Sequence, residues 1–311
     1  MTQMTLEITP PVSIAKAYSP SHITGFYSEV KDESTLNRGS LGAGISIRKG
    51  VRSTVELYDS ERNNFIIVIN GVISKDAIVS KFVINEFLKR TNKNYFIKVS
   101  HEVYLPIGYG IGTSGSAALS LAFALNDVLS LGLSDTESAQ IAHKAEIECK
   151  TGLGTVLSEF HGGLCIRIKG GAPGIGKTNV IRINNYKVAI FCFSPMFTQY
   201  FIESIRKISN DECNNMMMKV LKTKSTVDFL ELSHKFSKSL RFVNKTCNNL
   251  MDLLTQNGFH SSVALFGQTV FTIVKENELE TIKKISKNFP TRLFISEVEN
   301  EGARLIKKHD T

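Results

Sequence analysis

The stretch PIGYGIGTSGSAA, Pro106 to Ala118, decides the fold expected for this chain. It follows the strand-like segment YFIKVSHEVYLP and runs into SGSAALSLAFALNDVLSL, which is apolar on nearly every face, as a buried helix is. Its glycines are Gly108, Gly110, Gly112 and Gly115. Glycine adopts positive φ angles readily and lets the backbone approach a ligand closely, and a helix N-terminus attracts anions. The pattern therefore predicts a phosphate-binding loop at the start of a central helix.

Hydroxyl side chains in the same stretch suit a nucleotide. Thr113, Ser114 and Ser116 offer oxygen atoms to phosphate groups or to Mg²⁺. We therefore expect the phosphates of a nucleotide to lie against the loop as a whole. The expected cofactor-binding positions are Pro106, Gly108, Gly110, Gly112, Thr113, Ser114, Gly115 and Ser116.

A second glycine-rich stretch, GAPGIGKT at Gly171 to Thr178, matches the P-loop pattern GxxxxGK[ST] letter for letter. A P-loop functions because its Lys and Ser/Thr begin a helix whose amide groups face the phosphates. Here the following residues, NVIRINNYKVAIF, alternate like a strand. We therefore interpret this stretch as a turn between two strands.

Composition and charge narrow the class of protein. The chain has 311 residues, of which 42% are hydrophobic and 21% charged, and no apolar run reaches the ~20 residues that span a bilayer. Its first residues lack the basic start and apolar core of a secretory signal, so a cytoplasmic protein without a membrane partner is expected. The net charge of +8 is spread along the chain, which favours small anionic ligands over nucleic acid. Five widely spaced cysteines without a CxxC pair indicate reduced, mostly buried thiols.

The pattern along the chain changes several times. Short β-like stretches dominate residues 14 to 99, and helical periodicity begins at Ser114. A capping box at Ser134 to Glu137 starts a second helix that is expected to reach about Lys150. The strand-like segments GGLCIRI, VIRI and KVAIFCF follow, and helical and strand-like segments alternate beyond Pro195. We expect an α+β fold with an N-terminal domain of residues 1–186, which carries the loop, and a C-terminal domain of residues 187–311.

The second helix and a nearby strand supply candidate site residues. His143 and Glu146 are three residues apart and share a helix face, whereas Glu148 points elsewhere. Mg²⁺ favours one or two carboxylates together with phosphate oxygens and waters, so Glu146 with a serine hydroxyl is a sufficient ligand set. Arg167, in the strand-like CIRIK, offers a forked guanidinium that suits a substrate carboxylate. These residues favour a metal-assisted site for an acidic substrate.

Three stretches resemble, in order, the motifs of the GHMP kinases, the superfamily of galactokinase, homoserine kinase and mevalonate kinase. SPSHITGFY at Ser19 resembles the first motif, the loop at Pro106 the second, and SSVALFGQTVF at Ser261 the third. Together they span almost the whole chain. The resemblance implies ATP as a substrate and Mg²⁺ as its partner. It also implies a ribosomal protein S5 domain 2-like N-terminal lobe and a ferredoxin-like C-terminal lobe.

Within this superfamily the chain is most similar to the archaeal pantoate kinases, which phosphorylate the primary hydroxyl of pantoate on the way to coenzyme A. The similarity is carried by RGSLGAGISI at Arg38 and by AHKAEIECKTGLGTVLSEFHGGLCIRIKGGAPG at Ala142. It implies a homodimer in which Ser114 or Ser116, with Glu146, holds Mg²⁺ and the β- and γ-phosphates; the expected metal ligands are Ser114 and Glu146. The positions implied to face the substrate are His143, Arg167 and Thr198, with His22, Arg38 and Ser40 as further candidates. The expected catalytic positions are Ser114, Ser116, Glu146 and Thr155.

One position departs from that family. Pantoate kinases normally read TGLGD, in which the aspartate is the base that takes the substrate hydroxyl proton, whereas this chain reads TGLGT and ends the motif at Thr155. Threonine cannot accept a proton at neutral pH. Phosphoryl transfer depends mostly on positioning and charge stabilisation, and homoserine kinases also lack the aspartate, so a kinase remains the leading hypothesis. Glu159 is expected to be exposed, and would replace the base only if its turn directed it inward.

Three alternatives to a pantoate kinase stay open. The change at Thr155 and the positive charge suit a GHMP kinase for another hydroxy acid, such as mevalonate or a phosphomevalonate. A catalytically retired protein that binds ATP or a metabolite would also tolerate the lost aspartate. Binding of nucleic acid through S5-like strands is the weakest alternative.

Overall fold

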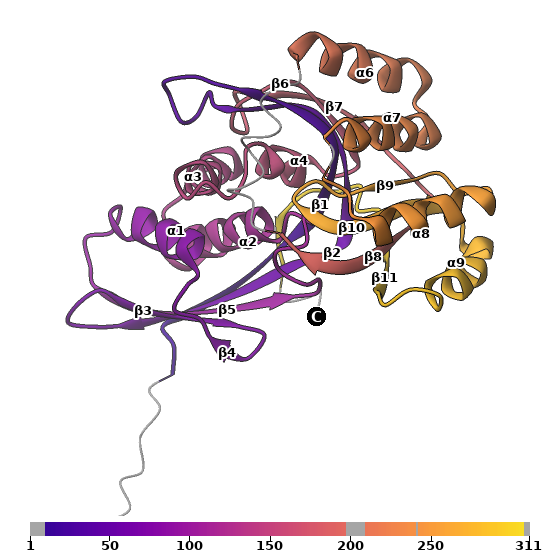
Figure 1. Cartoon of the computed structure of the whole chain (residues 1–311). Coiled ribbons are helices and arrows are strands. Elements are labelled where there is room, and N and C mark those ends of the chain that lie inside the picture. Colours follow the sequence, from indigo (N-terminus) through magenta and orange to yellow (C-terminus); the bar gives the residue numbers. More distant parts are fainter. Residues whose placement is uncertain (1–9, 197–208, 241, 308–311) are drawn as a thin grey trace, which may run out of the picture.

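The computed structural model describes residues 10–196, 209–240 and 242–307, and builds them around two β-sheets (Figure 1). The first sheet contains β1 (Ser13–Val30), β2 (Gly39–Asp59), β3 (Asn64–Ile69), β4 (Val72–Ile73), β5 (Tyr95–Val103), β6 (Leu164–Lys169), β7 (Lys177–Ile181) and β12 (Arg304–Leu305). The second sheet contains β8 (Lys187–Pro195), β9 (Ser261–Val263), β10 (Gly267–Val274) and β11 (Arg292–Glu297). The described helices are α1 (Ile78–Leu88), α2 (Thr113–Val128), α3 (Asp135–Glu148), α4 (Thr155–His161), α6 (Asn210–Thr223), α7 (Thr226–Ser239), α8 (Lys245–Gln256) and α9 (Leu279–Ser286), with a 3₁₀ turn at Glu276–Glu278.

The long strands β1 and β2 form the spine of the first sheet. They pair antiparallel from Ser13↔Leu57 to Val30↔Gly39, with register shifts near Ser19 and Thr24. One half of β2 then pairs with β5, and the other half pairs with β6. The β1–β2 pair therefore runs the length of the sheet and joins the part that contains β5 to the part that contains β6.

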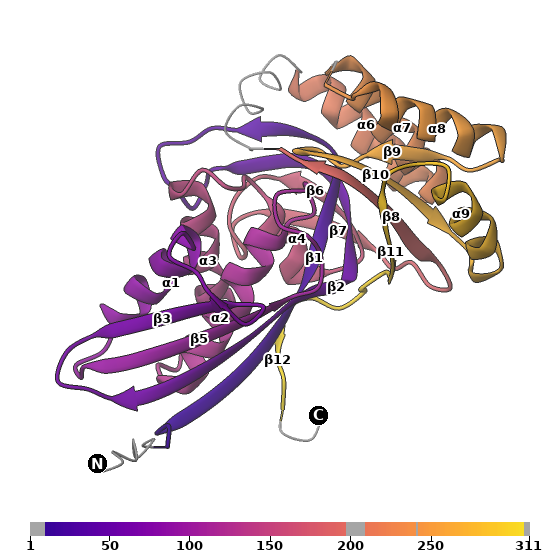
Figure 2. The ribbon, with the colours of Figure 1, turned by 60° about the horizontal axis from the view of Figure 1, so that its bottom comes forward.

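Helix α2 is the centre of the N-terminal part. Most of its residues are buried, among them the small residues Ala118, Ser120, Ala122 and Ala124. Small side chains let the backbones of a helix and a sheet approach closely, so α2 packs on β1 and β2 while α1, α3 and α4 surround it. Figure 2 shows α1, α2 and α3 on one side of the first sheet.

The second sheet has the strand order β11-β8-β10-β9, with all neighbours antiparallel. Numbered along the chain, this is the order 4-1-3-2 with helices after the first and third strands, which is the ferredoxin-like βαββαβ arrangement. Helices α7 and α8 pack against this sheet (Figure 2). The boundary expected at residue 187 coincides with the start of β8, but the division into two domains stays a prediction.

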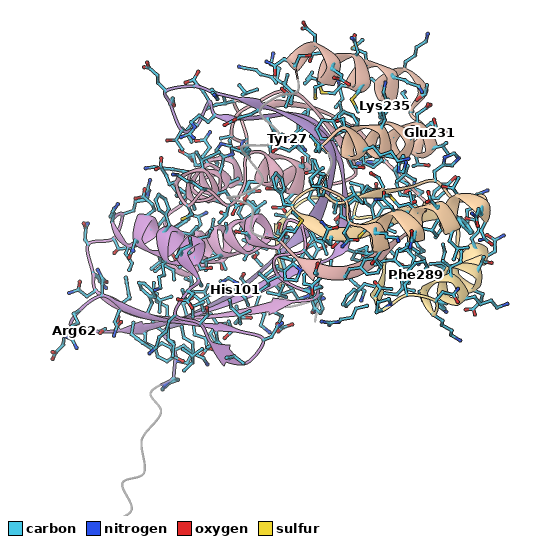
Figure 3. The ribbon with its side chains drawn as sticks, viewed as in Figure 1. Tyr27, Arg62, His101, Glu231, Lys235 and Phe289 are labelled. Carbon is cyan, nitrogen blue, oxygen red and sulfur yellow. The ribbon has the colours of Figure 1, made fainter. Side chains whose placement is uncertain are left out.

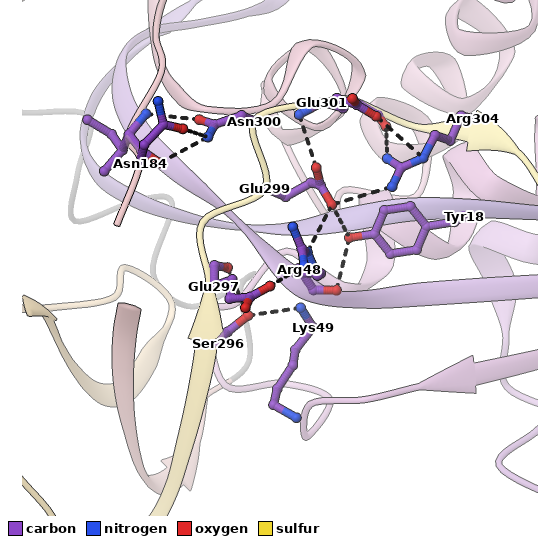
Figure 4. A network of polar contacts seen from close by, with 12 residues as sticks. Tyr18, Arg48, Lys49, Asn184, Ser296, Glu297, Glu299, Asn300, Glu301 and Arg304 are labelled. Carbon is purple, nitrogen blue, oxygen red and sulfur yellow. Dashed lines mark hydrogen bonds and ion pairs between the residues drawn. The ribbon is translucent and has the colours of Figure 1, made fainter. Parts of the chain in front are cut away.

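The two parts of the chain share a core. One cluster of buried side chains joins Ile23 and Phe26 of β1 to Phe229 of α7 and Phe271 of β10. The segment after β11 then returns to the first sheet, where β12 pairs with β1. In this return segment, buried Glu299 forms ion pairs with Arg304 of β12 and with Arg48 of β2 (Figure 4). The N-terminal sheet is thus completed by C-terminal residues.

The sequence-based expectations hold for most elements. The α+β class, the buried helix after Ser114, the capping box at Ser134 and the strand after Lys177 are confirmed. The expectation of only short strands before Val99 was wrong, because β1 and β2 are long and helix α1 lies between β4 and β5. The helix α4 after Gly154 was also missed. The described cysteines are all free, and only Cys149 is not fully buried, as expected.

No helix among the described residues combines the length and the apolar composition needed to cross a membrane.

The capping box at the start of α3 gives a first prediction. The Ser134 hydroxyl accepts a hydrogen bond from the Glu137 amide, and the Glu137 carboxylate accepts one from the Ser134 amide. Ser134→Ala should therefore lower the free energy of unfolding by about 1 kcal/mol, measured by urea denaturation. Glu137→Gln is the control, because a capping box accepts either Glu or Gln at this position. Equal stability of Ser134→Ala and the wild type would contradict this assignment.

Candidate active site

The glycine loop takes the conformation that its sequence predicts. Gly108, Gly110 and Gly112 have φ angles of 85°, 74° and 68°. Gly112 is the residue before α2, and the helix begins at Thr113. The amide groups of the first turn of α2, which have no acceptor within the helix, therefore point toward the loop. An anion bound there would be stabilised by hydrogen bonds from these groups and by the helix dipole.

The loop is held by a close contact with the turn between β9 and β10. A Cβ atom added at Gly110 would lie 2.3 Å from the Leu265 carbonyl oxygen, and one added at Gly267 would lie 2.1 Å from the Tyr109 carbonyl oxygen. Both neighbours are backbone atoms, which cannot move aside cheaply. The second and third sequence motifs, far apart along the chain, thus meet backbone to backbone.

The other glycine-rich stretch has no such setting. It turns back on Ala172, whose carbonyl accepts hydrogen bonds from the Ile175 and Gly176 amides, and it leads into β7. No helix begins at Thr178. The interpretation of this stretch as a turn between strands is confirmed.

Glu146 is the carboxylate that faces the loop. Its Oε1 accepts hydrogen bonds from Ser114 Oγ at 2.5 Å and Thr151 Oγ1 at 2.6 Å, and the Thr155 hydroxyl also hydrogen-bonds it. Burial raises the pKa of Glu146, while the three hydroxyl contacts act in the opposite direction. No cationic side chain pairs with Glu146 among the described residues. A buried carboxylate in such surroundings is stabilised strongly by an added cation.

The site is a cavity of about 930 Å³ between the loop, α3, the segment before α4 and the β9–β10 turn. Many of the residues expected from the sequence line it: His22, Ser40, Gly108, Gly110, Gly112, Thr113, Ser114, Glu146, Thr155 and Arg167. The cavity continues past His101 of β5 toward α1, and its other end lies beside Tyr27 of β1; both residues are labelled in Figure 3. The structure therefore brings together residues from nearly the whole N-terminal half of the chain.

Two cationic side chains line this cavity, the exposed Lys150 and the buried Arg167. The Arg167 side chain is only 1% exposed, yet its hydrogen-bond partners are neutral: Ser158 Oγ at 2.8 Å from Nη1 and His22 Nε2 at 3.3 Å. Its Nε has no hydrogen-bond partner in the described part of the chain. Burial, followed by the charge of Arg167, holds the pKa of His22 well below its usual value, so His22 is a neutral acceptor. No carboxylate pairs with Arg167 among the described residues. A buried guanidinium without a counter-ion is costly, and an anionic ligand would offset that cost.

Several expected site residues do not line the cavity. His143 is buried and its Nε2 lies 2.9 Å from the Arg38 carbonyl oxygen, and burial lowers its pKa to about 4. Ser116 is fully buried beneath the loop. Arg38, Pro106 and Gly115 are also absent from the lining, and Thr198 lies outside the described residues. The shared helix face of His143 and Glu146 is real, but it directs His143 to the backbone of a loop.

The expectation that Glu159 is exposed was wrong. It is 0% exposed, and its Oε1 lies 3.2 Å from Ser116 Oγ. The residue is on α4, one turn after Thr155, and this short helix had not been predicted. Its spacing of four residues from Thr155 puts both side chains on one face of α4, but this spacing indicates an inward position only once the helix is known.

The residues present fit a magnesium ion. The described residues contain no cluster of three or more His, Cys, Asp or Glu side chains that would hold a metal alone. Mg²⁺ does not need one, because it is held by one or two carboxylates together with phosphate oxygens and waters. Glu146 and Ser114 lie beside the phosphate loop and supply that partial set.

Comparisons with known proteins identify the family of this chain. The family described as GHMP kinases N terminal domain matches residues 77–163. The chain is 34% identical over 276 residues to a pantoate kinase of Methanocaldococcus jannaschii, which covers 87% of this chain and 97% of that protein. It is 29% identical over 302 residues to a pantoate kinase of Thermococcus kodakarensis, with 94% and 98% covered. A solved phosphotransferase related to coenzyme A biosynthesis has a TM-score of 0.86 at 26% identity and covers 95% of this chain and 99% of its own.

The fold, the phosphate loop and these matches define a GHMP kinase, an ATP-dependent kinase of small molecules. Within that superfamily, the chain belongs to the pantoate kinase family.

The backbone contact between the loop and the β9–β10 turn gives a second prediction. Gly110→Ala places a methyl group against the Leu265 carbonyl and imposes a positive φ on alanine, so it should displace the loop. Nucleotide affinity, measured by isothermal titration calorimetry, should fall by about 10-fold or more. Gly132→Ala is the matched control, because Gly132 also has a positive φ but nothing lies within 4 Å of its added Cβ. Equal affinities of the two variants would show that the contact does not set the loop.

Proposed function

We propose that this chain is an ATP:pantoate 4-phosphotransferase, which transfers the γ-phosphoryl group of ATP to the primary hydroxyl of pantoate in coenzyme A biosynthesis. The observation that carries the proposal is the buried guanidinium of Arg167, which lines the cavity beside the glycine loop and has no carboxylate partner among the described residues. The relatives named as pantoate kinases support the choice of hydroxy acid. The product is expected to be 4-phosphopantoate.

The substrate carboxylate is assigned to Arg167. A forked guanidinium pairs with a carboxylate through two parallel hydrogen bonds, and Arg167 has its Nε free of protein partners among the described residues. Neutral His22 and Ser158 hold Nη1, which fixes the plane of the fork. Gly154 lies next to Ser40 and Arg167: a Cβ added there would be 2.3 Å from Ser40 Oγ and 3.2 Å from Arg167 Nε, so a side chain at this position would crowd the fork. A small hydroxy acid held at Arg167 would have its hydroxyl turned toward Glu146 and the loop.

The phosphates are assigned to the loop and to the N-terminus of α2. Amide groups and the hydroxyls of Thr113 and Ser114 would bind them, and Glu146 with Ser114 would hold Mg²⁺. When bound, Mg²⁺ would neutralise the negative charge that develops on the leaving phosphate group. Glu146 performs that role only as the anion. Burial raises its pKa, and the three hydroxyl donors, together with the bound ion itself, would favour the anion.

Thr155 is assigned a positioning role rather than that of a base. Its hydroxyl hydrogen-bonds Glu146, at the place where the family normally has an aspartate. An aspartate there would set a second negative charge against Glu146, whereas threonine adds a donor. Transfer would then rely on alignment of the two substrates and on charge stabilisation, with the hydroxyl proton passing late in the reaction to an oxygen of the transferred phosphoryl group.

Two further assignments belong to the same proposal. We expect the protein to function in the cytoplasm, and as a homodimer, as its family resemblance implies. Neither assignment affects the chemistry of the cavity.

Product formation with a panel of acceptors tests the proposal. The purified protein is incubated with MgATP and pantoate, mevalonate, a phosphomevalonate or homoserine, and ADP release is measured. Pantoate should give the highest kcat/KM. Turnover of mevalonate or a phosphomevalonate without pantoate turnover would favour a kinase for another hydroxy acid. ATP binding without turnover of any acceptor would favour the catalytically retired homologue.

Arg167 gives a third prediction. Arg167→Gln keeps a polar side chain but removes the positive charge, so the KM for pantoate should rise by about 10-fold or more while the KM for ATP stays within about 2-fold. Steady-state kinetics with each substrate varied in turn measures both values. The exposed Arg182→Gln serves as the control for loss of one positive charge. A rise in the KM for ATP alone would move Arg167 to the nucleotide side.

Glu146 gives a fourth prediction. Glu146→Gln retains the shape of the side chain and its contacts with Ser114 and Thr151, but it removes the anion. Turnover should fall by about 100-fold or more, because electrostatic stabilisation is lost in a buried site. The exposed Glu148→Gln, two residues away, is the matched control. Unchanged kcat in Glu146→Gln would remove Glu146 from the catalytic machinery.

A further inference from the structure

Glu159 is a buried acid beside the phosphate loop, for which the proposed mechanism has no use. Its carboxyl group lies directly beneath the backbone of the loop: a Cβ added at Gly112 would be 2.7 Å from its Oε1, and one added at Gly115 would be 2.6 Å from its Oε2. Its side chain does not line the cavity, so neither substrate would touch it. The two glycines leave just the space that this carboxyl group fills.

The hydrogen bonds of Ser116 determine how Glu159 must be protonated. Ser116 Oγ lies 2.7 Å from the Pro20 carbonyl oxygen, 3.0 Å from the Gly112 carbonyl oxygen and 3.2 Å from Glu159 Oε1. A hydroxyl has one proton to donate and two lone pairs that accept, whereas a backbone carbonyl can only accept. Ser116 has one proton for three neighbouring oxygens, and the Pro20 carbonyl oxygen is the nearest of them, at 2.7 Å against 3.2 Å for Glu159 Oε1. We therefore assign the Ser116 proton to the Pro20 carbonyl. The contact with Glu159 becomes a hydrogen bond when Glu159 is the donor.

The surroundings of Glu159 agree with a neutral acid. The second carboxyl oxygen, Oε2, has no hydrogen-bond partner in the described part of the chain. Burial first, and the nearby charge of Glu146 second, raise the pKa of Glu159 well above its usual value. An ionised Glu159 would also repel Glu146 and the phosphate groups above it.

We propose that Glu159 is a positioning residue for the phosphate loop: as a neutral acid it donates a hydrogen bond to Ser116, which donates in turn to the Pro20 carbonyl. This chain of two hydrogen bonds joins α4 to the first turn of α2 and to the SPSH segment of β1. These hydrogen bonds fix the position of the loop backbone, and so the position of the amide groups that would bind the nucleotide phosphates. The proposal rests on the proposed function only for the nature of the ligand, a nucleoside triphosphate.

Substitutions that separate charge, volume and hydrogen bonding test the proposal. Glu159→Gln keeps the volume and a donor without a titratable proton. Glu159→Met keeps most of the volume and removes the donor, and Glu159→Ala removes both. Glu280→Ala, at a side chain that is 75% exposed on α9, is the control for loss of a glutamate. Affinity for the β,γ-methylene analogue of ATP with Mg²⁺ is measured by isothermal titration calorimetry, after thermal unfolding has shown that each variant is folded.

The expected result is a rescue by glutamine. Glu159→Gln and Glu280→Ala should bind the analogue within about 3-fold of the wild type, whereas Glu159→Met and Glu159→Ala should bind it about 10-fold or more weakly. Wild-type affinity in both Glu159→Met and Glu159→Ala would overturn the proposal. So would weak binding by Glu159→Gln, because it would show that the negative charge of Glu159 is required. If the methionine and alanine variants do not fold, Glu159→Gln alone still shows whether the negative charge of Glu159 is required for binding.

The acceptor substrate is absent from this measurement. Failure of the proposal on Glu159 is therefore distinct from failure of pantoate as the substrate, which only the turnover assay detects.

Discussion

The active site depends on one constraint, the backbone contact between the glycine loop and the turn before β10. Gly110 and Gly267 approach so closely that neither position has room for a side chain. The loop belongs to the first sheet and its helices, and the turn belongs to the second sheet, so the contact fixes one part of the molecule on the other. The buried cluster that contains Phe26, Phe229 and Phe271 also joins these two parts of the molecule. The contact also closes one side of the cavity, since Gly108 and Gly110 of the loop and Leu265 and Phe266 of the turn all line it.

Helix α4 connects the parts of the site, although it has only seven residues. Thr155 at its start contacts Glu146, Ser158 accepts a hydrogen bond from Arg167, and Glu159 reaches Ser116 under the loop. The carboxylate proposed for the metal, the guanidinium proposed for the substrate and the loop proposed for ATP are therefore tied to one rigid element. With threonine at position 155, α4 is tied to Glu146 by a hydrogen bond that the aspartate expected from the family resemblance would not donate when ionised.

Local signals in the sequence were enough to predict the loop, the capped helix α3 and the strand after Thr178, since each depends on residues close together in the chain. Helix α1 was missed because its many β-branched and aromatic residues, such as Val79, Val83 and Phe87, favour a strand, and packing against α2 overrides that preference. Helix α4 is too short to show a period. The burial of Glu159 and the turn of His143 toward the Arg38 carbonyl depend on contacts between distant segments, which a single sequence does not display.

The central claim is that the uncompensated charge of Arg167 is completed by the carboxylate of a small hydroxy acid. The most direct test is a crystal structure with pantoate and the β,γ-methylene analogue of ATP bound. The account predicts that a pantoate carboxylate oxygen lies about 2.7–2.9 Å from the Arg167 guanidinium, with the primary hydroxyl facing the γ-phosphate. Pantoate bound with its carboxylate away from Arg167, or the triphosphate of the analogue paired with Arg167 instead, would contradict it.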